Sequence, residues 1–405
     1  LRKDAFMNNA IQYPGLPEER LPDPPRQQPE KKRKEKILYD ERGLIDLPFL
    51  LLTVLLVLIG VVMMFSASYA SAYAEEGSST AYFARQGLFA LVGIGIMLFV
   101  SRVNYQVWRA LSFPILAGTI FLLMLVPIFG TEEGGARRWI YLGFTSFQPS
   151  EIAKLAVILT FATLMSSYKD KMKTFRYGVL PFAAILGVIA LLLVLEPHFS
   201  AIIIIFCVGA AMMFLGGTEL KWFALGLGVA AVFGFIYLKF MGYASDRIVA
   251  WRDPWADASD NGYQIVQSLY AIGSGGLMGL GLGRGRQKYL YLPEEHNDYI
   301  FAIVCEELGF VGAMVVLLLF VLLIIRGYWI AMHARDRFGA LMVGGLTTLL
   351  ALQVFFNIGV VTNFLPATGI SLPFFSYGGT ALLLQLFEMG LVLSVSRQSN
   401  NQLLL

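Results

Sequence analysis

The chain has 405 residues, of which 57% are hydrophobic and 15% are charged, and its formal net charge is +3. A soluble domain is about 25% charged, so this composition and several long apolar runs exclude an ordinary soluble domain and indicate an integral membrane protein. The basic residues lie in short clusters between the apolar runs, so no nucleic-acid partner is indicated. The only two cysteines, Cys207 and Cys305, lie inside apolar segments and are expected to be buried thiols rather than a disulfide framework.

Residues 1–46 differ in kind from the rest of the chain. Their stretch LPEERLPDPPRQQPEKKRKEK (16–36) is rich in proline and charge, a composition typical of disordered segments. The basic cluster KKRKEK (31–36) precedes the first apolar run, which predicts a cytoplasmic tail. The apolar run itself is too long for a cleavable signal peptide. At the other end, residues 398–405 are expected to form a short C-terminal tail.

Ten apolar runs follow, and each predicts a transmembrane helix. Lysine and arginine gather in alternate connections, on the side of the N-terminal tail, whereas the opposite short connections hold only three arginines. We therefore expect an all-α polytopic membrane protein with about ten transmembrane helices, both termini in the cytoplasm, and a membrane domain at 47–397. The runs lie at about 47–70, 84–101, 110–130, 150–167, 178–196, 198–216, 221–241, 299–325, 338–361 and 378–396.

One connection is far longer than the others. Residues 242–298, between the seventh and eighth predicted helices, are expected to form a large extracytoplasmic loop, and loops of this length are usually functional. Within it, GYQIVQSLYAIGSGG (262–276) has the pattern of a short helix lying on the membrane interface. GLGLGRGRQK (279–288) resembles a nucleotide-binding loop but lacks the GK[ST] ending. We interpret its glycines as a tight turn, with its basic side chains facing phosphates or water: Arg284, Arg286 and Lys288.

Five carboxylates crowd into YLPEEHNDYIFAIVCEELGF (291–310), where the long loop returns to the membrane: Glu294, Glu295, Asp298, Glu306 and Glu307. A charge at the bilayer centre costs at least about 2.5–3.5 kcal/mol, so these residues need partners or a function. Asp298 either satisfies the first turn of the eighth helix, or acts as a general base whose pKa is raised at a semi-desolvated boundary. His296 either tunes that carboxylate, binds a metal, or is polar surface.

Glu306 and Glu307 cannot both face lipid, because neighbours on a helix are about 100° apart. At least one must point into the bundle, where it needs a cation or hydrogen bonds, and Lys154 is the type of partner that we expect. Lys154 lies in FQPSEIAKLA (147–156) and is spaced to form an i,i+3 pair with Glu151. It either snorkels to the outer surface or is a fixed positive charge that holds an anionic group such as a diphosphate.

The outer loop GARRWIYLG (135–143) carries Arg137 and Arg138 on the side that the positive-inside rule leaves poor in basic residues. These arginines are either interfacial anchors or a phosphate-binding pair.

Two further outer segments are irregular. LEPHFSA (195–201) makes a short turn that offers Glu196 and His198. TGISLPFFSYGGTALL (368–383) begins the last helix with broken backbone, which membrane proteins tolerate only where it lines a cavity. Because acids, bases and irregular backbone all gather on the outer face, the residues support either an enzyme acting on a membrane-anchored substrate or a transporter.

Four motifs resemble one family. FQPSEIAK (147–154), QSLYAIGSGGLMGLGLG (267–283), LPEEHNDYIFAIVCEELG (292–309) and SLPFFSYGGT (371–380) are similar to signatures of the FtsW/RodA/SpoVE, or SEDS, peptidoglycan glycosyltransferases. The similarity extends from about residue 45 to residue 397 and leans towards FtsW. It implies a multi-pass protein of the bacterial cytoplasmic membrane that polymerises lipid II, the undecaprenyl-diphosphate-linked disaccharide peptide. The product is a β-1,4-linked glycan strand, made at the outer face for division or elongation.

The resemblance also implies roles for particular residues. The essential aspartate of the family's His-X-Asp-[Phe/Tyr]-Ile-Phe motif corresponds to Asp298, which would take a proton from the incoming sugar. The leaving diphosphate needs cations, for which Lys154, Arg137 and Arg138 are the candidates, together with a divalent cation, Mg²⁺ or Mn²⁺. A class B penicillin-binding protein, a transpeptidase, is the implied partner. The other motif residues expected to bind the substrate are Gln148, Glu151, His296, Gln267 and Ser376.

The chain departs from many relatives at one turn, where Glu196-Pro197-His198-Phe199-Ser200-Ala201 replaces Gln-Pro-Asp-Leu-Gly-Thr, which weakens any role carried over to it. Asn297 also stands where a threonine usually precedes the aspartate. Two other functions are alternatives, a lipid II flippase and a non-catalytic scaffold for a transpeptidase. Because the intramembrane charges cluster in the outer half, the polymerase is favoured over the flippase.

Overall fold

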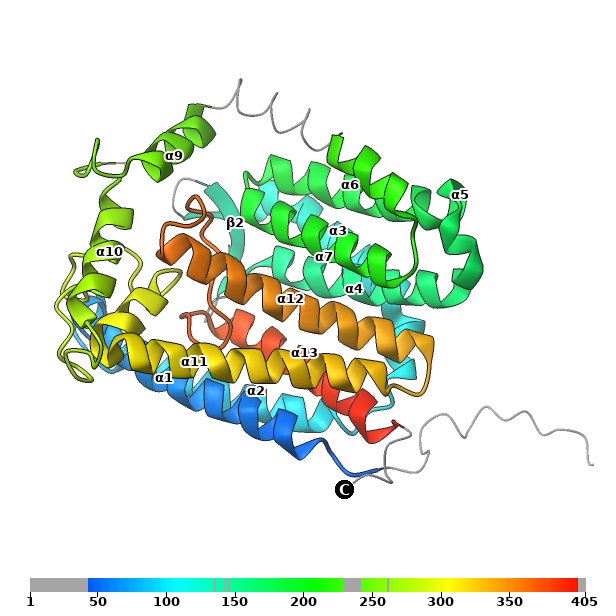
Figure 1. Cartoon of the computed structure of the whole chain (residues 1–405), viewed down its shortest axis with the longest axis horizontal. Helices are drawn as coiled ribbons and strands as arrows, with labels where there is room; N and C mark the ends of the chain where they lie inside the picture. The colour runs from blue at the N-terminus through cyan, green and yellow to red at the C-terminus, as the bar shows by residue number, and fades with distance from the viewer. Residues whose placement is uncertain are drawn as a thin grey trace, which may run out of the picture. The chain divides into compact units, whose positions relative to one another are not determined.

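Long apolar helices make up most of the chain in a computed structural model (Figure 1). The structure describes residues 43–133, 136–141, 143, 146–228, 242–260 and 262–399. Both predicted tails lie almost entirely outside these residues. Nine of the ten predicted spans are present as apolar helices. The seventh, at 221–241, is helical over its described part, 221–228.

Eight of these spans are long and apolar enough to cross a membrane, and α7 (Phe199–Leu215) is a shorter apolar helix. The short α5 (Phe175–Gly178) precedes α6 within one span, and a 3-10 helix, η1 (Lys169–Lys173), follows α4. The helices of the eight spans are α1 (Leu47–Glu76), α2 (Ala81–Val100), α3 (Gln106–Phe129), α4 (Pro149–Tyr168), α6 (Leu180–Leu195), α11 (Ile300–Met332), α12 (Arg337–Val361) and α13 (Gly379–Arg397).

Two helices form the centre of the bundle. In α4 and α12, 72% and 78% of the apolar 18-residue stretch is buried inside the protein. In the spans of α1, α2, α3, α6 and α11 the corresponding share is 28–39%. α12 packs against α4, α7 and α11, while α13 packs along α2 (Figure 1). A helix surrounded by other helices can carry polar side chains into the membrane, because those side chains meet protein rather than lipid.

Capping aspartates set the cytoplasmic ends of two helices. Asp46 accepts a hydrogen bond from the Phe49 amide at the start of α1, and Asp336 accepts one from the Gly339 amide at the start of α12. Asp46 also pairs with Arg326 near the end of α11, at 2.8 Å. This pair joins the beginning of α1 to the cytoplasmic end of α11.

The outer connections contain structure that hydropathy did not predict. Between α3 and α4 lies a three-stranded antiparallel sheet of β1 (Thr131–Glu133), β2 (Ala136–Tyr141) and β3 (Ser146–Phe147). The all-α prediction therefore holds for the spans but not for this connection, whose strands are too short to give a periodic signal. The long loop contains α9 (Gly242–Arg252) and α10 (Tyr263–Gly275), which confirms the helix predicted at 262–276.

Candidate active site

The outer part of α11 is interrupted at one glycine, and the backbone of the long loop forms hydrogen bonds with the residues on both sides of it. Gly309 has φ 70° and ψ −173°, so the helix is interrupted there. Four backbone hydrogen bonds of 2.9–3.1 Å link residues 276–281 of the loop to residues 306–311 and satisfy the groups that the break frees. The two backbones meet so closely that a Cβ at Gly309 would lie 2.2 Å from the Gly279 nitrogen. The glycines of 279–283 thus allow both the turn and this approach.

The same loop supplies the partners of the two intramembrane glutamates. Glu306 and Glu307 are each 1% exposed. Glu307 pairs with Lys288 at 2.7 Å and accepts a hydrogen bond from Ser66 of α1. Glu306 accepts from the backbone amide of Arg286 at 2.8 Å. Two predictions are therefore wrong: Lys288 does not face phosphates or water, being only 2% exposed, and the glutamates are not paired with Lys154.

Lys154 lies elsewhere and is buried. Its Nζ is 2.7 Å from Glu151, which confirms the predicted i,i+3 pair, and the residue is 5% exposed. The snorkelling interpretation is thus wrong. The charges of Lys154 and Glu151 also act on Glu388 of α13, which is 6% exposed. Lys154 is a fixed positive charge inside the bundle, near the start of α4.

Asp298 lies two residues before the start of α11, is half-buried, and is held at its backbone carbonyl by a side chain of α12. Asn357 of α12 is fully buried, and its Nδ2 donates to the Asp298 carbonyl at 2.7 Å and to the Ile370 carbonyl at 2.8 Å. Gly369 has φ 67°, and a Cβ there would lie 3.5 Å from Asp298 Oδ2. Among the residues that the structure describes, no side chain caps α11, so the capping interpretation of Asp298 is not supported.

Burial raises the pKa of Asp298 to about 6, and the charge of Glu294 raises it further, whereas Arg247 and His296 lower it. At that pKa the carboxylate is mostly ionised at neutral pH yet basic enough to accept a proton. Arg247, on α9, also donates to the Ala367 carbonyl at 2.9 Å. Sequence reasoning missed Arg247, because nothing in its neighbourhood distinguishes it from the other charges of the long loop.

The broken start of α13 is fastened to the Asp298 segment. Ser376 Oγ donates to the Asn297 carbonyl at 2.7 Å, and the Tyr377 amide donates to the His296 carbonyl at 2.8 Å. The His296 ring lies against the rings of Tyr82 and Tyr377, with centroids 5.4 and 5.8 Å away. The predicted residues His296 and Ser376 therefore lie in one group with the Asp298 segment, and the hydrogen bonds from Ser376 and Tyr377 hold the two residues that precede Asp298.

The remaining predicted residues lie on other elements. Arg137, on β2, is more than half exposed and its Nε is 4.0 Å from Glu132. Arg138 donates to the Pro197 carbonyl at 2.8 Å and so lies over the turn between α6 and α7. Gln148 directly precedes α4, and Gln267 is half-buried on α10.

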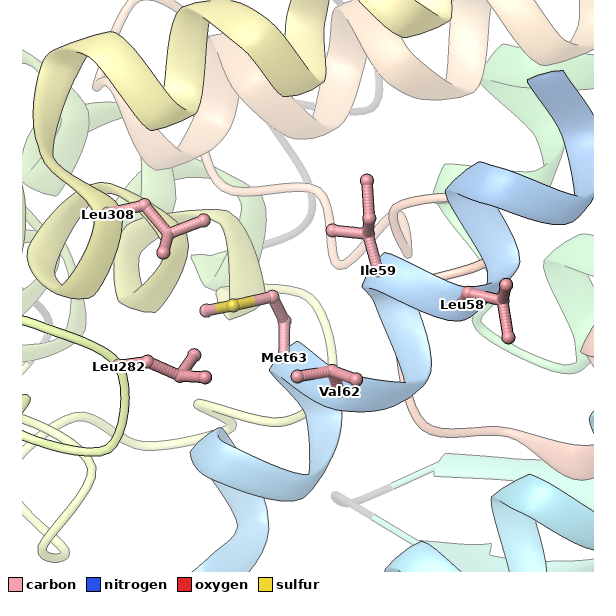
Figure 2. A pocket seen from close by; sticks show the side chains of 6 residues that line it. All are labelled: Leu58, Ile59, Val62, Met63, Leu282 and Leu308. Carbon is pink, nitrogen blue, oxygen red and sulfur yellow. The ribbon is translucent and has the colours of Figure 1, made fainter.

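The described side chains differ in what they could bind, a metal ion or hydrocarbon. Within the described residues, no three His, Cys, Asp or Glu side chains are grouped so that they could hold a metal ion. A pocket of about 290 Å³ lies between α1, α11 and the long loop (Figure 2). Its lining is entirely apolar, so it can hold hydrocarbon but offers no group for chemistry: Leu58, Ile59, Val62, Met63, Leu282 and Leu308.

Comparisons with known proteins agree with this architecture. The family described as cell cycle protein, FtsW/RodA/SpoVE, matches residues 47–401. A probable peptidoglycan glycosyltransferase FtsW of Geobacter sulfurreducens is 40% identical over 354 residues, which is 87% of this chain and 95% of that protein. Stage V sporulation protein E of Bacillus subtilis is 41% identical over 357 residues, covering 87% of this chain and 97% of that one.

Two solved structures share the fold. A chain of a peptidoglycan synthase complex that coordinates polymerization and crosslinking superposes with a TM-score of 0.74 at 26% identity, covering 88% of this chain and 99% of that one. The rod shape determining protein RodA of Thermus thermophilus has a TM-score of 0.66 at 26% identity, with coverage of 88% and 98%.

Proposed function

Because the chain belongs to the FtsW/RodA/SpoVE family of cell cycle proteins, we propose that Asp298 is the general base with which it polymerises lipid II. The chain is a peptidoglycan glycosyltransferase of the bacterial cytoplasmic membrane. The observation that carries the proposal is a half-buried aspartate at the outer end of α11, with its pKa raised to about 6. Lipid II presents its sugars at this boundary, since its head is in water and its tail is in lipid.

The proposed reaction is an inverting displacement. The 4-hydroxyl of the incoming sugar attacks the anomeric carbon of the growing strand while the Asp298 carboxylate takes the hydroxyl proton. The bond from the anomeric carbon to the diphosphate oxygen breaks, and undecaprenyl diphosphate leaves with the electron pair. A new β-1,4 bond results. Lys154 is the buried positive charge that would stabilise the leaving diphosphate, since fixed charge acts strongly where water is excluded.

We propose that the divalent cation expected from the resemblance binds together with the diphosphate. Among the side chains that the structure describes, none of the His, Cys, Asp and Glu groupings is large enough to hold a metal ion by itself. Such an ion would neutralise charge on the leaving group. Removing it with a chelator should therefore weaken diphosphate binding, while the thermal stability of the substrate-free protein should not change.

We also propose that the partner is a class B penicillin-binding protein. The solved relative with a TM-score of 0.74 belongs to a peptidoglycan synthase complex in which polymerization and crosslinking are coordinated. Co-purification of the full chain with its transpeptidase tests this association.

The function itself is tested with purified protein, lipid II and a divalent cation. The wild type should form glycan strands, and Asp298→Asn should lower the rate by about 10²–10⁴-fold, the usual contribution of a general base. Asp260→Asn is the matched control, because Asp260 is an exposed aspartate of the same long loop. Strand synthesis by Asp298→Asn at the wild-type rate would rule out the proposed role.

The same preparation separates the alternatives. A flippase would move labelled lipid II across a vesicle bilayer without making strands. A scaffold would bind its transpeptidase while showing neither activity.

A further inference from the structure

The turn between α6 and α7 holds polar groups that are buried but not hydrogen-bonded. Glu196 is 1% exposed and His198 is 8% exposed. Neither carboxyl oxygen of Glu196, nor Nδ1 of His198, has a hydrogen-bond partner among the described residues. Buried polar atoms are nearly always paired, and each unpaired one costs about 1–3 kcal/mol. Three such atoms in one turn therefore indicate a ligand.

Two hydroxyl groups on other segments share this property with the turn. Ser150 Oγ at the start of α4 and Thr368 Oγ1 are also buried without a hydrogen-bond partner in the described part of the chain. Arg138 donates to the Pro197 carbonyl, and the charges of Arg138 and Lys154 both act on His198. The turn therefore lies close to the buried lysine that would hold the diphosphate.

The turn is also connected to the catalytic aspartate. Ser200 donates a hydrogen bond to the Thr368 carbonyl. The next residue, Gly369, is the one whose Cβ would lie 3.5 Å from Asp298 Oδ2. Segment 366–370 thus contacts the turn on one side and Asp298 on the other.

The protonation states define what such a ligand can be. Burial raises the pKa of Glu196 to about 8 although Arg138 lowers it, so the carboxyl group is mostly neutral near pH 7. Burial lowers the pKa of His198 to about 3, so the imidazole is neutral as well. A neutral carboxyl group donates one hydrogen bond and accepts others, and a neutral imidazole donates one and accepts one. Such groups suit hydroxyl and amide groups, not phosphate.

We propose that Glu196 and His198 form a subsite that binds the hydroxyl or acetamido groups of a sugar of the lipid-linked substrate. This inference rests on the proposed function for the identity of the ligand. It gives the turn in which this chain departs from many relatives a role of its own. Lys154 and Arg138 hold the charged end of the substrate, and Glu196 and His198 hold its neutral end.

Equilibrium binding of lipid II to the full-length chain carrying Asp298→Asn tests the subsite without turnover. Adding Glu196→Leu should raise Kd about tenfold, which corresponds to about 1.4 kcal/mol. Adding Glu196→Gln, which keeps a donor and an acceptor, should raise Kd only about twofold. Adding His198→Leu should weaken binding by an amount similar to Glu196→Leu. Glu219→Gln is the control, because Glu219 lies between α7 and the following span and pairs with Lys221; Kd should not change.

The dependence of the Kd for lipid II on pH gives a second test. As pH rises through about 8, Glu196 ionises. The carboxylate can no longer donate a hydrogen bond and its charge repels the diphosphate, so the Kd for lipid II should rise. Arg138 from β2 is the charged group that acts on Glu196, and Arg138 and Lys154 both act on His198 in the same turn. The Glu196→Gln protein should lose this rise, whereas the other charges are common to both proteins.

The inference is overturned if Glu196→Leu keeps the thermal unfolding midpoint of its parent and binds lipid II equally well. A Kd that stays constant above pH 8 in the parent would overturn it too, and would leave the turn as a site for buried water. If Glu196→Leu does not fold, the near-isosteric Glu196→Gln and the pH series decide. Absence of strand synthesis by the wild type, with Kd still dependent on Glu196, would reject the proposed function and keep the subsite.

Discussion

As the proposed base, Asp298 can accept a proton only when its carboxyl group is ionised, and burial sets the pH at which this happens. Its pKa is raised to about 6, so the carboxyl group is protonated below that pH and cannot accept the sugar proton. We expect kcat/KM for strand synthesis to rise with pH, with a midpoint near 6, because this ratio reports the ionisation of the free enzyme. Initial rates measured with labelled lipid II across this range give the midpoint.

Glu294 provides the internal check on that assignment. Its negative charge raises the pKa of Asp298, so Glu294→Gln should move the ascending limb of the profile to lower pH. A limb that stays in place would mean that a different group titrates. The experiment leaves the Asp298 carboxyl group itself untouched.

Asn357 positions Asp298 without touching the substrate. Its Nδ2 is the shared donor to the carbonyls of Asp298 and Ile370, so Asn357→Leu leaves both without it. We expect kcat to fall about tenfold or more with little change in KM, and stability to fall by about 1–3 kcal/mol. Steady-state kinetics and thermal unfolding measure the two effects.

Gln353 offers the matched control on the same helix. It is also a buried amide of α12, 3% exposed, but it makes no contact that the structure shows with the Asp298 backbone. Gln353→Leu should change stability and leave kcat near the wild-type value. Equal losses of kcat in the two variants would assign Asn357 a general packing role.

At the scale of the elements, hydropathy predicted the helices but not their partners. The spans were predictable because a bilayer requires long apolar segments. The i,i+3 pair of Lys154 and Glu151 was predictable because helix geometry alone sets it. The pair of Lys288 and Glu307 was not predictable, since a loop returns into the membrane to form it. No local rule places a residue of a glycine-rich loop beside a helix residue 19 positions later.

The Lys288–Glu307 pair should be strongly coupled because both side chains are buried. Lys288→Met leaves the Glu307 charge without its cation, and the loss of stability should be about 3–5 kcal/mol. Adding Glu307→Leu to Lys288→Met should recover a large part of that loss, because no unpaired charge then remains inside the bundle. Thermal or denaturant unfolding in detergent compares the single and double variants.

An exposed pair gives the contrast for this cycle. Lys221 and Glu219 form an ion pair whose side chains are 62% and 40% exposed, so Lys221→Met should cost at most about 1 kcal/mol. Losses at Lys288 and Glu307 that simply add would contradict a direct pair. In that case the loop would be held by its backbone hydrogen bonds and by the amides that donate to Glu306 and Glu307.

The helices of the whole molecule become more polar from the lipid-facing surface to the centre of the bundle, and the mean hydropathy of each span partly reflects this change. The three most buried spans, α4, α12 and α13, also have the lowest mean hydropathy of the eight. Lower hydropathy is thus a property of the spans that face protein, which the sequence analysis did not use, and two of these spans carry Lys154 and Asn357. The outer sheet and the contacts of segment 366–370 with Asp298 were beyond sequence reasoning, because they depend on tertiary contacts between distant outer segments.

This arrangement requires the long loop and the cytoplasmic connections to lie on opposite sides of the membrane. Ser259 is exposed in the long loop, and Lys171 is exposed between α4 and α5. In a chain whose Cys207 and Cys305 are replaced by alanine, Ser259→Cys should react with a membrane-impermeant thiol reagent in intact cells. Lys171→Cys should react only after the membrane is permeabilised, and the cysteine-free parent should not react at all. Labelling of Lys171→Cys alone in intact cells would place Asp298 on the cytoplasmic side, where the growing wall is absent, and the proposed polymerisation could not occur there.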